Sequence, residues 1–179
     1  ATVPELDGVD LLSSESFCQL GGDPRPSTIE GPDADHATAM TALIAGNGRG
    51  TGPGGAGVRG VAPDAQLRHY AALYYEGDGQ EAAREGGMVC NMGGGYNWSG
   101  HRSVPAAITQ AAEDGADIIN VSISTQHGLD YAEAVLAAQR HNAIVVTTVA
   151  DDGSMIWPAE NNGVVVVNSV RQDTAISDR

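Results

Sequence analysis

The side chain best placed to transfer a proton is His36, at the start of an alanine-rich segment that runs to Gly46. Apolar residues recur at helical spacing in this segment, with Asp35 as the expected N-cap and Gly46 as the expected stop. The positive end of a helix dipole disfavours an imidazolium, so we expect His36 to be neutral and able to accept a proton. Four further histidines have no comparable setting: His69, His101, His127 and His141.

A glycine-dense run from Gly46 to Gly60 follows this segment. It is not a phosphate-binding loop, because it lacks a Lys-Ser/Thr ending and follows a predicted helix rather than a strand. It contains no carboxylate either, so we expect a surface loop that binds no metal. Nothing else in the sequence calls for a cofactor.

Cys18 and Cys90 are the two cysteines of the chain. Neither their spacing nor their neighbours fit a metal site, so one disulfide in an exported protein and two free thiols both remain open. The N-terminus, Ala1–Leu6, lacks the basic and apolar regions of a signal peptide. It also lacks an initiator Met, which indicates a processed N-terminus. The sequence does not decide between a secreted and a cytoplasmic location.

The composition indicates an acidic protein with a single domain. The chain has 179 residues, with 9 basic residues against 23 acidic ones and a net charge of -14. This length is sufficient for one hydrophobic core. The charge repels phosphate backbones and anionic lipids, so we expect neither a nucleic-acid partner nor a membrane partner. No run approaches the roughly 20 apolar residues that a membrane-spanning helix needs.

Helical and strand patterns alternate from Asp35 onward. The residues before it are rich in proline and glycine and indicate loop, with one short strand near Val9–Leu12. The second and third helices are expected at 104–114, with Gly115 just past its end, and at 129–142, with Ala132, Val135, Leu136 and Ala138 on its apolar side. Expected strands cover residues 65–73, 117–123, 143–149 and 163–167, and residues 76–100 read as irregular.

The later strands are near-continuous apolar runs, which leaves them no face for water. Strands of this kind that alternate with helices indicate an α/β fold with a parallel sheet covered on both faces. In such sheets functional groups gather beyond the carboxyl ends of the strands.

Four segments, in chain order, resemble those of the subtilase family of serine proteases. They are residues 35–46 (Asp-His-Ala-Thr-Ala-Met-Thr-Ala-Leu-Ile-Ala-Gly), 60–67 (Gly-Val-Ala-Pro-Asp-Ala-Gln-Leu), 115–124 (Gly-Ala-Asp-Ile-Ile-Asn-Val-Ser-Ile-Ser) and 143–167. The resemblance covers about residues 35–179. It implies a subtilisin-like, three-layer α/β/α domain with a mostly parallel sheet, of which residues 1–179 form a part.

In this family a serine attacks the peptide bond, a histidine takes its proton and an aspartate orients the histidine. The resemblance makes His36 the base and leaves the aspartate open. One alignment assigns it to Asp7, which a glycine follows. The other places Val3–Leu6 just after the family's aspartate, which then lies before Ala1. We favour the second alignment, because Ala1–Leu6 is too short and proline-broken to form the strand that ends at the aspartate.

The family's serine motif, Gly-Thr-Ser-Met-Ala, does not occur in the chain. Ser154 stands in a Gly-Ser-Met triplet, but it follows the oxyanion strand at once, whereas the family's serine opens a much later helix. We therefore expect a second polypeptide segment to supply the serine, for example after a cut at Arg179 that leaves two chains packed together. Otherwise the protein is an inactive relative.

Asp151 stands where the family has an asparagine that donates a hydrogen bond to the oxyanion. An ionised aspartate cannot donate, so it serves only if an apolar site keeps it protonated. Asp152 beside it favours protonation, because two adjacent carboxylates resist double ionisation. A solvated acidic turn in a degenerate site is the other interpretation. Ala37 and Ala150 also replace expected glycines, and Ala150 narrows the primary pocket.

The same alignment predicts the two walls of a substrate cleft: Ser122, Ile123 and Ser124 on one side, and Thr148, Val149 and Ala150 on the other. A peptide substrate would add to the first wall as a β-strand. The leading hypothesis is thus a subtilisin-like serine endopeptidase that works through an acyl-enzyme and is completed by a segment outside this chain. The rivals are an inactive subtilase-like module that binds or scaffolds peptides, and an unrelated α/β binding protein.

Overall fold

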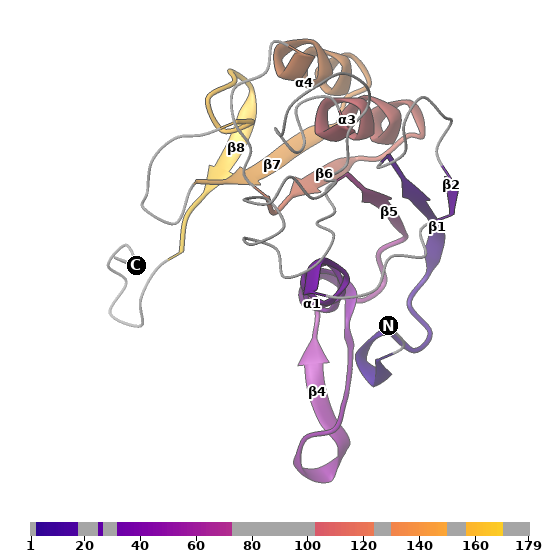
Figure 1. Cartoon of the computed structure of the whole chain (residues 1–179). Helices are drawn as coiled ribbons and strands as arrows, with labels where there is room; N and C mark the ends of the chain where they lie inside the picture. The colour runs from indigo at the N-terminus through magenta and orange to yellow at the C-terminus, as the bar shows by residue number, and fades with distance from the viewer. Residues whose placement is uncertain are drawn as a thin grey trace, which may run out of the picture.

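The computed structural model describes residues 3–17, 25–26, 32–72, 103–123, 130–149 and 157–169. Strands and helices alternate along them, as expected (Figure 1). In chain order the elements are η1 (Pro4–Leu6), β1 (Leu11–Ser16), β2 (Arg25–Pro26), α1 (Pro32–Ala45), β3 (Asn47–Arg49), η2 (Pro53–Gly55), β4 (Ala56–Arg59), β5 (Leu67–Ala71), α3 (Ser103–Glu113), β6 (Ile118–Val121), α4 (Asp130–Arg140), β7 (Ile144–Thr148) and β8 (Val164–Val167). None of the helices in these ranges is long and apolar enough to cross a membrane.

Two three-stranded sheets form the middle layer. The order of one is β2-β1-β5, with β1 and β5 parallel, and the order of the other is β6-β7-β8, with all three strands parallel. Helices α3 and α4 lie on one side of the strands and α1 lies on the other (Figure 1). The predicted α/β fold with a mostly parallel sheet is confirmed.

Helix α3 connects the two sheets. It packs against both β5 and β6, and the Ser103 hydroxyl at its start donates a 2.6 Å hydrogen bond to the Ala72 carbonyl just after β5. The two strands nevertheless belong to separate sheets. Within the described ranges, β5 and β6 therefore each keep one edge without a strand partner.

The first half of the chain departs from the sequence predictions. The expected strand at Val9–Leu12 is β1, which begins at Leu11 and continues to Ser16. Helix α1 begins at Pro32 and not after Asp35, so the prediction of Asp35 as N-cap is wrong. A proline is well suited to start a helix, since it fixes a helical φ at a position whose N–H needs no partner in the helix.

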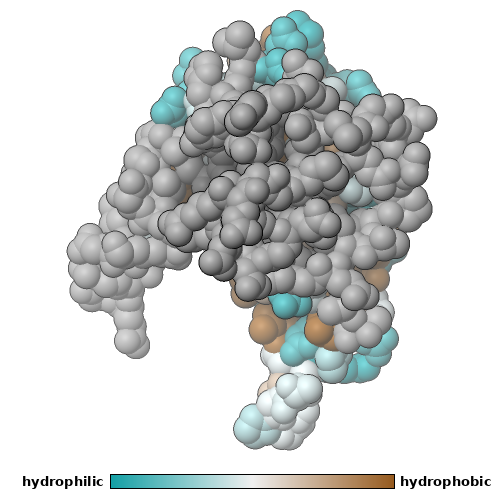
Figure 2. Space-filling view, viewed as in Figure 1, coloured by the Kyte–Doolittle hydropathy of each residue, from teal (hydrophilic) through white to brown (hydrophobic). Residues whose placement is uncertain are grey.

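The glycine-dense run is not an irregular loop but a β-hairpin of β3 and β4. Its turn passes through Gly54 and Gly55 at φ values of 71° and 78°, in the left-handed region that favours glycine. The hairpin projects from the molecule below α1 (Figure 1) and is white to pale teal in Figure 2, since glycine is nearly neutral on the hydropathy scale.

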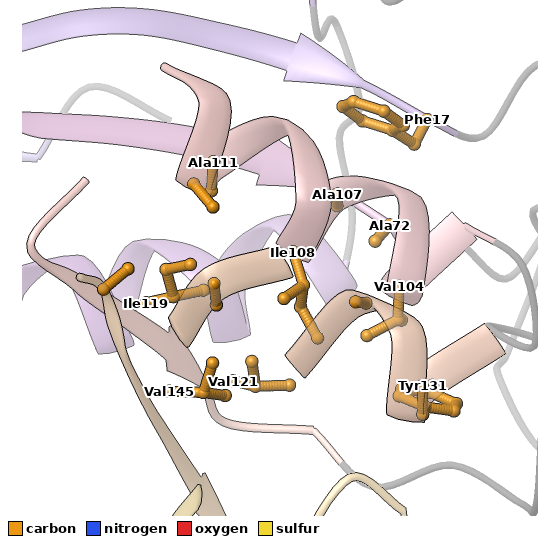
Figure 3. Packing of buried hydrophobic residues seen from close by; sticks show 14 residues of the cluster. Phe17, Ala72, Val104, Ala107, Ile108, Ala111, Ile119, Val121, Tyr131 and Val145 are labelled. Atoms are coloured by element: carbon orange, nitrogen blue, oxygen red, sulfur yellow. The ribbon is translucent and has the colours of Figure 1, made fainter. Parts of the chain in front are cut away.

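The core lies between the β6-β7 strands and the two helices above them, α3 and α4 (Figure 3). Ile108, Tyr131 and Val145 are almost fully buried there. The buried face of α4 consists of Tyr131, Ala134, Val135 and Ala138, while Leu136 is 45% exposed. Ala132 and Leu136, which the sequence placed on the apolar side of this helix, are therefore exposed, because the bulky Tyr131 sets the buried stripe one residue earlier.

Both core helices are followed by a residue in the left-handed conformation, at Gly115 as expected after α3, whereas α4 ends at Arg140, before its expected end at Asn142. Gly115 follows α3 at φ 83°, and Ala116 N–H reaches back to the Ala111 carbonyl at 3.0 Å. Asn142 follows α4 at φ 61°, with Ala143 N–H bonded to the Ala138 carbonyl at 2.9 Å. Both ends have the left-handed cap in which the orphan carbonyls of the last turn find donors.

The end of α1 is capped by a different segment of the chain. The amide groups of Gly60, Val61 and Ala62 donate to the carbonyls of Gly46, Leu43 and Ile44, at 2.8, 3.1 and 2.8 Å. A Cβ atom on Gly60 would overlap the backbone of Ile44 and Ala45. The Gly-Val-Ala-Pro segment therefore caps α1 by donating hydrogen bonds to the carbonyls at its end. The backbone of residue 60 lies so close to the helix that only glycine fits there.

We predict that Gly60→Ala lowers the free energy of unfolding by about 1–3 kcal/mol, because the added methyl group forces the cap away from α1. The matched control is Val61→Ala, since the Val61 side chain is 90% exposed while its backbone makes the same kind of bond. Urea denaturation of both variants measures the difference. Equal stability of the two variants would contradict the role given to Gly60.

Candidate active site

His36 contacts the end of strand β6, far along the chain. Its Nε2 atom lies 3.1 Å from the backbone carbonyl oxygen of Ser122, the residue that follows β6. A carbonyl oxygen only accepts hydrogen bonds, so Nε2 carries the proton and donates it. The imidazole is exposed to solvent. The predicted base and the first residue of the predicted cleft wall are thus in direct contact.

The position of His36 on its helix differs from the expectation. Because α1 begins at Pro32, His36 is its fifth residue and lies in the second turn. The field of a helix terminus falls off within the first turn. The helix terminus therefore acts on this imidazole more weakly than the expected position at the helix start implied.

The predicted cleft residues that the structure describes lie at the carboxyl ends of two neighbouring parallel strands. Val121, at the end of β6, is opposite Thr147 in β7, so Ser122 and Ile123 continue beside Thr148 and Val149. All four are half-buried, and Ile123 packs against the core. Ser124, Ala150, Asp151 and Ser154 lie outside the described residues.

Asn120 supports this edge of the sheet, although its sequence context did not single it out. Its side-chain amide donates a 2.8 Å hydrogen bond to the hydroxyl of Ser122, two residues along on the same face of β6. An isolated polar residue in an otherwise apolar strand is the signal that identifies such a position.

The structure does not bring Asp7 to His36. Asp7 follows the short helix η1 rather than an apolar strand, and its backbone carbonyl accepts a 2.8 Å bond from the Asn47 amide. Asn47 lies just past the end of α1. The helix rises about 14 Å from His36 to Ala45, so Asp7 lies near the opposite end of α1 from the imidazole. This geometry does not support Asp7 as the residue that orients His36.

Among the described residues, three titratable groups with shifted pKa values link β5 to neighbouring elements: His69, Tyr70 and Asp114. Burial lowers the pKa of His69, whose Nδ1 lies 3.0 Å from the Ser14 hydroxyl across the strand pair. Burial and a hydrogen bond to Asp114 raise the pKa of Tyr70, and the same 2.5 Å bond lowers the pKa of the Asp114 carboxyl. Asp114 is the residue just after α3, so its hydrogen bond with Tyr70 links the end of α3 to strand β5.

Two further histidines and both cysteines, His101, His127, Cys18 and Cys90, lie outside the described residues, and His141 is exposed just past α4. Within the described ranges no three His, Cys, Asp or Glu side chains gather as a metal site would require.

Solved protease structures share the fold of this chain. Sphericase matches 98% of this chain with a TM-score of 0.68 and 21% identity. The epidermin leader peptide processing serine protease of Staphylococcus aureus matches 94% with a TM-score of 0.66 and 19% identity. The patellamide maturation protease matches 98% with a TM-score of 0.59 and 15% identity. These likenesses show the fold.

The matched chains are considerably longer than this one. The present chain spans 52% of the sphericase chain and 44% of the epidermin-processing protease. The minor extracellular protease Vpr of Bacillus subtilis (strain 168) is 28% identical over 145 residues, which are 79% of this chain and 14% of Vpr.

The model of the subtilase family matches residues 12–179, nearly the whole chain. This match excludes an unrelated α/β binding protein, and it agrees with the fold and with the contact between the histidine helix and strand β6. The chain belongs to the subtilase family.

Proposed function

We propose that this chain is the histidine-bearing part of a subtilisin-like serine endopeptidase domain, completed by a segment outside residues 1–179 that supplies the serine. The observation that carries the proposal is the 3.1 Å contact between His36 and the Ser122 carbonyl at the end of β6. It supports a base held at the mouth of a peptide-binding cleft. A peptide or protein is the substrate that such a family implies.

In the proposed reaction the serine hydroxyl attacks the peptide carbonyl and His36 takes its proton. The imidazolium then gives that proton to the leaving amine, and water hydrolyses the acyl-enzyme by the same steps in reverse. The ring nitrogen that accepts the serine proton must have a free lone pair. Since Nε2 now donates to Ser122, the ring has to release this bond when the serine arrives.

The substrate peptide is proposed to run beside Ser122, Ile123 and Ser124 as an added strand. Thr148, Val149 and Ala150 form the second wall of the cleft. Because Ala150 narrows the primary pocket, this pocket accepts small side chains of the substrate. The half-buried positions of the described members support this assignment, because a cleft wall must be both firmly held and reachable.

A segment outside the chain is also proposed to supply the orienting aspartate. Two observations support this: Asp7 lies near the far end of α1, and the edges of β5 and β6 have no strand partner among the described residues. An added strand between these edges would end beside Ser122, at the level of His36.

The second candidate is an inactive module that keeps the cleft and binds peptides. The observation that favours it is Asp151, at the position where the family has an oxyanion-binding asparagine. Both candidates share the histidine contact, so only chemistry at the serine separates them.

A fluorophosphonate probe separates the two candidates when it is applied to the protein expressed from its own gene in its natural host. We expect the wild type to be labelled and His36→Ala to lose labelling by about 10⁴-fold or more, since an unactivated serine reacts slowly. His141→Ala is the matched control and should label normally, because His141 is exposed beyond α4. An unlabelled wild type favours the inactive module, and a labelled His36→Ala variant rules out His36 as the base.

Replacement of Asp151 tests the oxyanion position. In a subtilisin, loss of the asparagine donor costs about 10²–10³-fold in rate. If Asp151 is ionised, Asp151→Asn should raise the rate of probe labelling by up to about 10²-fold. Glu133→Gln, at an exposed position of α4, is the control that leaves the rate unchanged. A slower Asp151→Asn variant would instead indicate that a protonated Asp151 already donates.

The bond to Ser122 predicts the tautomer of His36 in residues 1–179 alone. At alkaline pH the proton of the neutral ring should reside on Nε2, where the carbonyl accepts it. Long-range ¹H–¹⁵N spectra distinguish the two ring nitrogens, and the exposed His141 provides an internal reference in the same spectrum. A proton on Nδ1 would show that the contact with Ser122 does not persist in solution.

A further inference from the structure

The charges of this protein are unevenly distributed along the chain. Residues 36–63 contain two arginines, Arg49 and Arg59, and no aspartate or glutamate, so all 23 acidic residues lie outside this segment. Both arginines belong to the β3-β4 hairpin, which is therefore basic on a chain whose net charge is -14. A basic element on an acidic protein attracts anionic partners that the remaining surface repels.

The hairpin projects away from the other elements, below α1 (Figure 1). All four residues of β4 are exposed, and so is Arg49 in β3. Among the residues that the structure describes, neither guanidinium group takes part in a hydrogen bond or an ion pair. Glu5 of η1 lies against Gly50, but its carboxylate pairs with neither arginine. Both positive charges are thus available to a partner.

The two arginines are spaced as alternate side chains are in an extended peptide. Arg59 is opposite Asn47, which is two residues before Arg49 in β3. At about 3.3 Å per residue the two arginines are about 7 Å apart along the hairpin, which is also the distance between alternate residues of a β-strand. Carboxylates at alternate positions of a bound strand can therefore meet both guanidinium groups.

The hairpin can also bind the backbone of such a peptide. It is a sheet of two strands, so β3 and β4 each have one edge without a strand partner within the described ranges. Gly48, Gly50 and Gly57 carry no side chains that would keep another backbone away. Free N–H and C=O groups along a sheet edge form a template for an added strand. Nucleic acids and lipids cannot form this ladder, so the hairpin favours a polypeptide.

We propose that the β3-β4 hairpin is a docking site for an acidic polypeptide segment of a partner protein, which adds to its edge as a β-strand and pairs its carboxylates with Arg49 and Arg59. The site is separate from the substrate cleft, because the hairpin follows the end of α1 that lies about 14 Å from His36. The inference goes beyond the proposed function and does not depend on the serine.

A second copy of this chain is a poorer partner. Each copy carries a net charge of -14, so two whole copies repel each other. A short acidic segment of another protein brings only a few negative charges near the acidic surface, and these charges lie beside the arginines.

Defined peptides test the proposal on the whole protein, expressed from its own gene in its natural host and purified. The probe is a fluorescent peptide of alternating glutamate and threonine, and its matched control alternates glutamine and threonine. We expect the glutamate peptide to bind, with an affinity that falls as salt is added, because exposed charges are screened. Fluorescence anisotropy measures both peptides. An unbound glutamate peptide, or equal binding of the two peptides, would overturn the proposal.

Charge-neutralising variants locate the binding. The double variant Arg49→Gln/Arg59→Gln should bind the glutamate peptide about 5- to 10-fold more weakly, since each exposed ion pair contributes little by itself. The control Arg68→Gln/Arg140→Gln removes the same two charges from exposed positions on β5 and α4 and should bind like the wild type. Equal weakening in both variants would show attraction without a site on the hairpin, which contradicts the proposal.

Backbone methylation distinguishes an added strand from simple charge attraction. Two versions of the glutamate peptide carry N-methyl groups on every glutamate or on every threonine, so each version lacks the N–H donors along one of its sides. We expect one version to bind about 10-fold more weakly than the other, because only one side pairs with the hairpin. Equal binding of the two versions is incompatible with strand addition.

Two other occupants are outcomes of the same measurements. Tighter binding of oligothymidylate or anionic vesicles than of the glutamate peptide, lost in the Arg49→Gln/Arg59→Gln variant, would overturn the choice of a polypeptide. Self-association of the protein that this variant abolishes would make a second copy the occupant, which also overturns the proposal. Fluorophosphonate labelling of the variant should equal that of the wild type, so the docking site and the proposed function succeed or fail separately.

Discussion

Three backbone hydrogen bonds from residues 60–62 to the end of α1 hold the histidine helix in place. They satisfy carbonyls that no residue of the helix itself can reach. Because one end of α1 is held this way, the other end projects His36 to the carbonyl of Ser122, at the end of a strand 86 residues further along the chain. The candidate site depends on this connection, since the imidazole is exposed and makes no core contact of its own.

A second constraint comes from the half-covered sheet. Helices α3 and α4 bury one side of β6 and β7, and the Tyr131 and Trp157 rings, 5.9 Å apart, extend that packing toward β8. On the opposite side of these strands Ile118, Ile144, Val165 and Val167 are exposed.

The second half of the fold could be predicted from the sequence because its signals are local. Apolar runs in the sequence predicted the strands β6, β7 and β8, and Gly115 predicted the end of α3. In the structure Gly115 adopts the left-handed conformation that ends the helix. The errors arose where tertiary contacts decide. The pairing of two glycine-rich strands into a hairpin and the exposure of Leu136 depend on partners that periodicity does not contain. The start of α1 at Pro32 had a local signal, since proline favours the first position of a helix, but the prediction placed the start after Asp35.

The site was predictable in outline but not in detail. The order of four motifs placed His36 near Ser122, and the structure brings the two together. The sequence could not reveal that Nε2 donates to a backbone carbonyl, that Asn120 supports Ser122, or that Asp7 lies toward the far end of α1. Each of these depends on a distance between segments remote in sequence, for which residue type and spacing carry no information.

We propose that this chain provides the base and that another segment supplies the nucleophile. Mass spectrometry of the naturally produced protein after fluorophosphonate labelling identifies the modified peptide. We expect a modified serine in a peptide outside residues 1–179. Modification of Ser154, or of any other serine within the chain, would contradict it.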